Sequence, residues 1–284
     1  MIETGHSRAE VSVADRTSRP APNGFARRIR VLFSPALLWG TGSILAGLLV
    51  WEAVYRLFKV SPLVLSPPSA IATEFAKLTR DGTLATDIVV SAQQFFIGYI
   101  VASVIAVLIG LLFGVNRTFR YIADPWVQAL YATPTVSLAP LFIIWLGFGL
   151  ESKAMIVGLL VFFPVLINTA EGVRSLHIDI ADVAAAFGST KNEYFWKVVL
   201  PATQPHIFTG LRLAVARGII GLVVGDLFGS SKGLGYLILN ASQLFNTPML
   251  FVGTVILAIA GVLLTGALTV MERAMSPWTR VKRT

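Results

Sequence analysis

The sequence has no cysteine and little charge, and each shortage excludes a class of protein. A chain without cysteine has neither disulfides nor thiolate metal sites. Only 13% of the 284 residues are charged and 55% are hydrophobic, whereas soluble domains carry about 25% charged residues. So few polar groups cannot cover the surface of a soluble protein. The composition therefore predicts a protein embedded in a membrane.

Residues suited to catalysis are also scarce. The three histidines, His6, His177 and His206, have no metal-ligand spacing among them. The chain lacks the Gly-x-x-x-x-Gly-Lys-Ser/Thr phosphate loop, and Gly229–Gly233 has the wrong residue order for one. We therefore expect no catalytic residue, no metal ion, no cofactor and no ATP hydrolysis in this chain itself.

Long uncharged stretches supply the predicted membrane spans, because an apolar helix needs about 20 residues to cross the hydrocarbon core. The segment 207–228 contains Arg212, Arg217 and Asp226, so we predict a helix buried within a bundle rather than facing lipid. The predicted fold is an all-α integral membrane protein with six transmembrane helices, at 34–57, 88–115, 125–148, 154–172, 207–228 and 249–271.

The distribution of basic residues predicts the orientation, since cytoplasmic loops are enriched in Lys and Arg. With the N-terminus inside, 15 of the 23 Lys and Arg residues lie in inner segments and 5 in outer segments. Both termini and the 173–206 loop are thus predicted to be cytoplasmic. The transmembrane domain covers 34–275, between a flexible segment 1–33 and a tail 276–284. Topology and anionic lipids explain the net charge of +8 better than nucleic acid does.

A polar segment, 182–201, separates the fourth and fifth predicted spans. Gly188 can adopt the left-handed conformation that closes a helix. Thr190 and Glu193 have the spacing of a capping box, which begins a second helix, and we expect Pro201 to stop that helix. The pattern predicts two short helices on the inner face of the membrane, offered to a soluble partner.

This segment also resembles the "EAA" coupling loop of permeases in bacterial ATP-binding-cassette importers, written E-A-A-x-x-x-G-x9-I-x-L-P. The chain keeps the motif at Ala184, Gly188, Leu200 and Pro201. It departs from the motif, with similar residues, at Asp182, Val183 and Val198. The resemblance implies an ATPase-coupling loop that includes Asp182, Ala184, Ala185, Gly188, Leu200 and Pro201.

Motifs elsewhere resemble the subfamily of these permeases that imports taurine, aliphatic sulfonates, nitrate and similar small solutes. They stand at Leu65–Ser69, Thr133–Pro134, Phe163–Thr169 and Gly233–Ile238, and the resemblance covers roughly residues 35–275. It implies a permease subunit in the bacterial inner membrane, paired with a second permease subunit. The pair is expected to be a homodimer, with a similar but distinct second chain as the alternative. The implied partners are two ATP-binding subunits, which would hold the ATP and Mg²⁺, and an external solute-binding protein.

Breaks and charges within the spans indicate where a pathway could lie. Thr133 and Pro134 break the third span and Pro164 the fourth, and broken helices are tolerated where they are buried or line a water-filled path. Arg217 and Asp226 are costly at membrane depth, near 3 kcal/mol each at mid-helix. They face nearly opposite sides of one helix and cannot pair with each other. Each therefore needs a partner on another helix, a solvated cavity or a second subunit. All five residues are candidates for lining the pathway, with structural interhelical bonds as the alternative for the two charges.

Two glycine pairs, Gly110-x3-Gly114 and Gly221-x3-Gly225, favour close packing of helices in lipid. In the long outer segment 59–87 we expect a short surface helix over 70–79. It could dock the external binding protein or only cover the end of the bundle. Two other functions remain open: an ion-gradient-driven secondary transporter, which would usually show an inverted repeat, and a membrane scaffold without transport.

Overall fold

The computed structural model describes residues 35–176, 180, 183–184 and 186–276. Every regular element within these residues is a helix, so the predicted all-α class is confirmed there. The predicted N-terminal segment 1–33 and all but the first residue of the predicted tail 276–284 lie outside the described residues.

The chain divides into two units after Ala53. The first unit contains most of α2 (Pro35–Leu57), an apolar helix of 23 residues whose range matches the predicted first span. Its length exceeds the roughly 20 residues that a membrane span requires.

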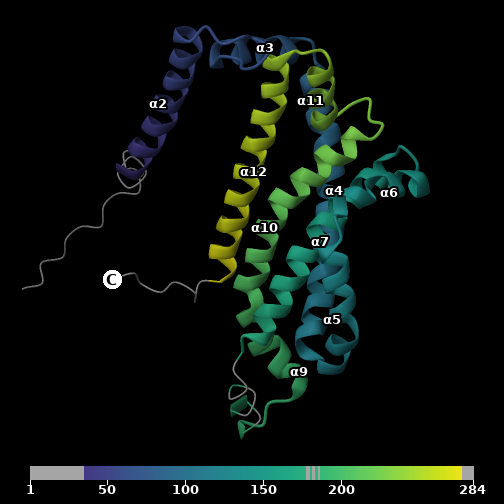
Figure 1. Ribbon diagram of the computed structural model, residues 1–284. Helices are drawn as coiled ribbons and strands as arrows, with labels where there is room; N and C mark the ends of the chain where they lie inside the picture. The colour runs from purple at the N-terminus through teal and green to yellow at the C-terminus, as the bar shows by residue number, and fades with distance from the viewer. Residues whose placement is uncertain (1–34, 177–179, 181–182, 185, 277–284) are drawn as a thin grey trace, which may run out of the picture. The chain divides into compact units, whose positions relative to one another are not determined.

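The second unit holds the remaining helices in chain order (Figure 1). They are α3 (Pro68–Arg80), α4 (Thr83–Val115), α5 (Arg117–Ala132), the 3₁₀ helix η1 (Thr135–Leu138), α6 (Ala139–Leu146), α7 (Leu150–Arg174), α9 (Lys191–Tyr194), the π-helical η2 (Phe195–Val199), α10 (Leu200–Leu227), α11 (Leu234–Gln243) and α12 (Thr247–Met275).

Four helical stretches among the described residues are long and apolar enough to cross a membrane. A fifth is the pair of segments Arg117–Ala132 and Thr135–Leu146, which meet at an angle of 87°. The predicted break in the third span is therefore confirmed, and the two segments on either side of it are sharply bent relative to each other. The four straight stretches are Thr83–Val115, Leu150–Arg174, Lys191–Leu227 and Thr247–Met275.

Helix α7 lies between α4 and α10 and forms the centre of the second unit (Figure 1). Val157, Val161 and Val165 recur every four residues on α7 and are fully buried, as the 3.6-residue period of a helix requires for one face. On α4, Gly98 packs so closely that an added Cβ would lie 2.3 Å from the carbonyl oxygen of Ala154. Helices in lipid associate through such close approaches.

The glycines singled out in the sequence make the same kind of contact. A Cβ at Gly114 would lie 2.2 Å from the Cβ of Val173, and one at Gly221 would lie 3.0 Å from the Cα of Val157. The prediction that these glycines serve helix packing is confirmed for both positions. Their partners both belong to α7, which explains why α7 is the most buried of the candidate spans.

The helix expected over 70–79 is α3, which begins at Pro68. Proline suits the first turn of a helix, because its fixed φ is helical and its missing N–H would have no partner there.

An ion pair joins the fifth and last predicted spans. Arg212 of α10 pairs with Glu272, near the C-terminal end of α12, and also donates to Thr209 Oγ1 at 3.1 Å. The charge of Arg212 in the fifth span is therefore matched by the last span.

Candidate functional site

The polar segment after α7 begins with a helical turn that ends at Gly188. Val183, Ala184 and Ala186 are helical, whereas Asp182 and Ala185 lie outside the described residues. Gly188 has a φ of +73°, and the N–H of Ser189 donates to the carbonyl of Ala184 at 3.0 Å. A bond across six residues with glycine in the left-handed region is the Schellman closure of a helix. The prediction that Gly188 closes this helix in the left-handed conformation is confirmed.

The capping box that begins the second helix is also present. The N–H of Glu193 donates to Thr190 Oγ1 at 3.3 Å, and the N–H of Thr190 donates to Glu193 Oε2 at 3.1 Å. Lys197 Nζ lies 2.9 Å from Glu193 Oε1, one turn further on. These bonds satisfy N–H groups that the helix leaves free at its start. Helix α9 therefore has a firmly defined first residue.

The expectation that Pro201 stops this helix is wrong. The helix continues from α9 through η2 into α10, and Pro201 lies in the first turn of α10. In η2 the N–H of Leu200 donates to the carbonyl of Phe195, five residues back. This wider π turn shifts the hydrogen-bond pairing just before Pro201, which has no N–H to donate. The predicted fifth span at 207–228 thus begins within a longer helix.

Two large aromatic side chains of this segment point away from the protein. Phe187 is 88% exposed and Trp196 is 60% exposed, one before and one within the helical stretch that follows Gly188. Aromatic residues are enriched at the centres of protein interfaces. The segment therefore exposes two large apolar side chains of the kind that protein interfaces bury.

The bend in the third span lies beside a pocket. Thr133 and Pro134 connect α5 to η1, and Thr133 Oγ1 donates to the carbonyl of Ala129 at 2.9 Å. The pocket next to this bend, of about 220 Å³, is lined by Pro164 of α7 and by Arg217 of the neighbouring helix α10. Its other lining residues are Tyr131, Thr135, Leu159, Leu160 and Phe163. The structure thus brings Arg217, Pro164 and the predicted break together.

Asp226 is not part of that pocket. It is fully buried, and its Oδ1 lies 3.7 Å from Nζ of Lys153 on α7. Its Oδ2 accepts a hydrogen bond from the N–H of Gly235 at 3.1 Å. Of the alternatives that the sequence left open for Asp226, the structure shows a partner on another helix, Lys153, and the arrangement favours a structural bond for Asp226.

Sequence comparisons identify the family. The sequence profile described as "Binding-protein-dependent transport system inner membrane component" matches residues 102–281, more than half of the chain. The chain belongs to this family. It is a permease of the ATP-binding-cassette importers. This decides for ATP-driven import and against the ion-gradient-driven secondary transporter that the sequence left open.

Individual relatives align with the permease over most of its length. It is 34% identical over 242 residues to the "Putative aliphatic sulfonates transport permease protein SsuC" of Bacillus subtilis, and 29% identical over 242 residues to the "Taurine transport system permease protein TauC" of Escherichia coli. Each alignment covers 84% of this chain and 88% of the relative. The "Formylaminopyrimidine transport permease protein ThiX" of Halalkalibacterium halodurans is 30% identical, over 81% of this chain and 92% of its own.

Some contacts of the permease were not predicted from its sequence. Asp87 Oδ1 accepts a hydrogen bond from Gly233 N–H at 2.8 Å, and Ser91 Oγ accepts one from Leu234 N–H at 2.7 Å. Together with Lys153 they hold the segment before α11 against α4 and α7. The sequence did not indicate that Asp87 and Lys153 are buried, because both lie at predicted ends of spans, where a charged side chain can reach water. The one signal in the sequence was the charge of Asp226 within a span, which called for a partner on another helix, a solvated cavity or a second subunit.

Proposed function

We propose that this permease conveys a small sulfonate-type anion and that Arg217 contacts it. Two of the relatives are named for aliphatic sulfonates and taurine, and both solutes carry a sulfonate group. A guanidinium group recognises such an oxyanion with paired N–H donors. Nitrate stays a prediction of the resemblance.

The position of Arg217 carries this proposal. It lies near the middle of α10 and faces the pocket beside the bend, where Thr135 and Tyr131 add hydroxyl groups. Among the described residues, no carboxylate lies within ion-pair distance of Arg217. A charge at that depth is costly unless it has water or a counter-ion. An anionic solute would supply the missing charge.

Uptake by the reconstituted importer tests the role of Arg217. We expect Arg217→Gln to raise the KM for the anionic solute at least tenfold, since a hydrogen bond to a charged group contributes about 1.5–3 kcal/mol. Arg217→Lys keeps the charge and should recover part of the affinity. Normal KM in correctly folded Arg217→Gln protein would remove Arg217 from the pathway.

We further infer six spans, formed by α2, α4, the bent pair from α5 to α6, α7, α10 and α12. Two apolar stretches complete the set: the 23 residues of α2 and the bent pair. An even number of spans places both termini on one side, and the basic residues favour the cytoplasm for that side.

The absence of cysteine makes the orientation directly testable, because any introduced cysteine is the only one in the chain. Asn192→Cys on α9 and Ser231→Cys before α11 are both exposed positions. A membrane-impermeant maleimide should label Ser231→Cys in intact spheroplasts and Asn192→Cys only in inside-out vesicles. The reverse pattern would overturn the orientation.

The loop with Gly188, α9 and its exposed aromatic residues is proposed to dock onto an ATPase subunit. Two copies of that subunit would bind the ATP and Mg²⁺, beneath a homodimer of this permease and opposite an external solute-binding protein. Affinity purification from native membranes, followed by mass spectrometry of stoichiometric partners, tests this assembly. A co-purifying subunit with a phosphate loop supports it, and recovery of the permease alone in a detergent that preserves such complexes contradicts it.

A further inference from the structure

A second pocket, of about 580 Å³, lies at the ends of α4, α7 and α10 on the side of the protein that holds α9. Gly114 and Val115 end α4, Val173 and Arg174 end α7, and Val199 directly precedes α10. The wall is completed by Arg117, Arg120 and Tyr121 from the start of α5, by Leu176, and by Lys191, Tyr194 and Phe195.

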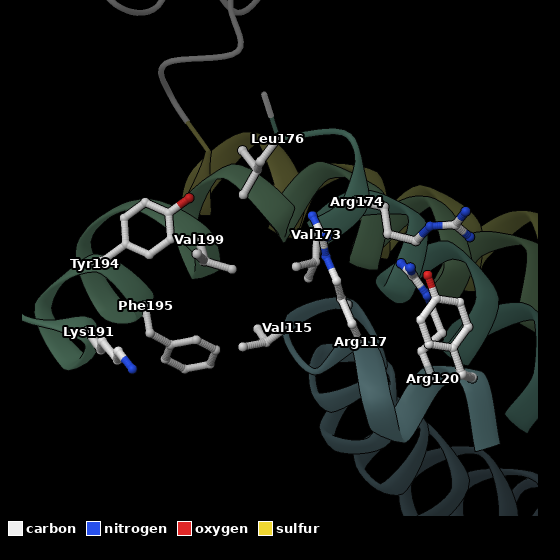
Figure 2. A pocket seen from close by; sticks show the side chains of 12 residues that line it. Val115, Arg117, Arg120, Val173, Arg174, Leu176, Lys191, Tyr194, Phe195 and Val199 are labelled. Carbon is white, nitrogen blue, oxygen red and sulfur yellow. The ribbon is translucent and has the colours of Figure 1, made fainter. Parts of the chain in front are cut away.

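Four of the lining side chains are cations. Figure 2 shows Arg117, Arg120 and Arg174 grouped on one side of the hollow and Lys191 on the opposite side. Arg174 has a carboxylate partner, Glu171, at 3.4 Å. No carboxylate within the described part of the chain lies within ion-pair distance of Arg117, Arg120 or Lys191. The pocket thus holds more positive than negative charge, which repels itself and favours an anion.

Apart from the tyrosines Tyr121 and Tyr194, the rest of the wall is apolar. Val115 and Phe195 lie between the two groups of cations in Figure 2. Val173 and Val199, which also line the pocket, are buried. A fully hydrated ion would gain nothing from such a surface. A phospholipid presents a phosphate and, joined to it through glycerol, the first carbons of its acyl chains.

We propose that this pocket binds the phosphate group of an anionic phospholipid headgroup from the cytoplasmic leaflet. Basic pockets between spans at the cytoplasmic surface are suited to such headgroups, because that leaflet is rich in anionic lipid. The proposal rests on the orientation given under the proposed function, which places this end of the spans in the cytoplasm. The pocket is separate from the one that contains Arg217.

An occupant would connect three parts of the permease. Arg117 and Arg120 belong to α5, which leads into the bend, whereas Lys191 is the first residue of α9. An occupant with its phosphate on Arg117 and Arg120 and its apolar part against Val115 and Phe195 would connect the start of α5 to the end of α4 and to η2. Anionic lipid should therefore stimulate substrate-dependent ATP hydrolysis by the assembled importer.

The test uses the importer complex in nanodiscs of phosphatidylcholine with increasing phosphatidylglycerol. Bound phosphatidylglycerol is counted by native mass spectrometry, and substrate-stimulated ATPase activity is measured in parallel. Since each basic residue contributes about fivefold to binding an anionic surface, Arg117→Gln/Arg120→Gln should weaken saturable retention roughly 25-fold. Arg273→Gln is the matched control, because Arg273 is exposed in the last turn of α12 and does not line the pocket.

A parallel series in pure phosphatidylcholine with inorganic phosphate distinguishes a lipid phosphate from a free one. Saturable retention of phosphatidylglycerol that the double variant loses and Arg273→Gln keeps supports the proposal. Saturable binding of inorganic phosphate alone would assign the site to a free phosphate and overturn the lipid proposal. Equal retention in all three proteins overturns the proposal. So does a double variant that keeps its lipid but loses the ATPase subunit, since the pocket is then a protein contact. Lipid counting needs no transported solute, so an error in the proposed solute leaves this result unaffected.

Discussion

The buried ion pair between Lys153 and Asp226 should be the most sensitive polar contact in the described part of the permease. Its atoms are 3.7 Å apart, and the two side chains are 9% and 0% exposed. Lys153 Nζ also donates to Ser230 Oγ at 2.6 Å. The pair therefore joins α7, the end of α10 and the segment that leads to α11.

Removing one partner leaves the other charge buried without compensation, which costs about 3–5 kcal/mol. We therefore expect Lys153→Met or Asp226→Asn alone to destabilise the permease by about that amount. Each kcal/mol of destabilisation lowers the melting temperature of a chain of this size class by about 2–4 °C, so each variant should melt roughly 6–20 °C below the parent. The double variant carries no unpaired charge, and its asparagine still accepts the N–H of Gly235. Its loss should be much smaller than the sum of the two single losses.

The assay is the temperature at which half of the purified permease is lost from the folded peak in size-exclusion chromatography. Lys77→Met is the matched control, because Lys77 pairs with Glu74 at 3.4 Å on the surface, and exposed pairs contribute at most about 1 kcal/mol. Single variants that melt within 2 °C of the parent, or a double variant whose loss equals the sum, would refute a coupled buried pair.

Two further predictions concern glycines. A large side chain at Gly188 should abolish substrate-stimulated ATPase activity of the importer while the spans stay inserted, because Gly188 has a φ of +73° beside the exposed Phe187; Gly82→Trp, at the same φ near α3, is the control for Gly188→Trp. Gly98→Leu should clash with Ala154 and destabilise the permease by about 1–3 kcal/mol through overpacking, which lowers its melting temperature. Gly266→Leu is the control, because Gly266 has open space around it and the melting temperature should stay unchanged.

Features fixed by neighbouring residues were predictable from the sequence. The capping box at Thr190 and Glu193 needs only a spacing of three, and Gly188 needs only its own conformational freedom. Long apolar runs gave the positions of the membrane helices in the same way. Each of these signals is contained within one segment, so no knowledge of the fold is required to interpret it.

Features fixed by contacts between segments were not predictable. Lys153 belongs, by sequence, among the outer basic residues, and only the packing of α7 against α10 turns it into the partner of Asp226. The four cations of the second pocket likewise counted as evidence of orientation. Their gathering around Val115 and Phe195 follows from where α4, α5 and α9 end. In both cases the charge was visible and its partner was not.

The continuous helix through Pro201 has a consequence for how the permease works. Because η2 carries the helix past Pro201, Lys191–Leu227 is one helical stretch of 37 residues. At 1.5 Å per residue it extends about 55 Å, whereas the hydrocarbon core is about 30 Å thick. Roughly 25 Å of continuous helix must therefore lie beyond the core. Since this stretch includes both α9 and Arg217, a displacement of α9 by a docked subunit would be carried along the helix axis to the Arg217 pocket without crossing a loop.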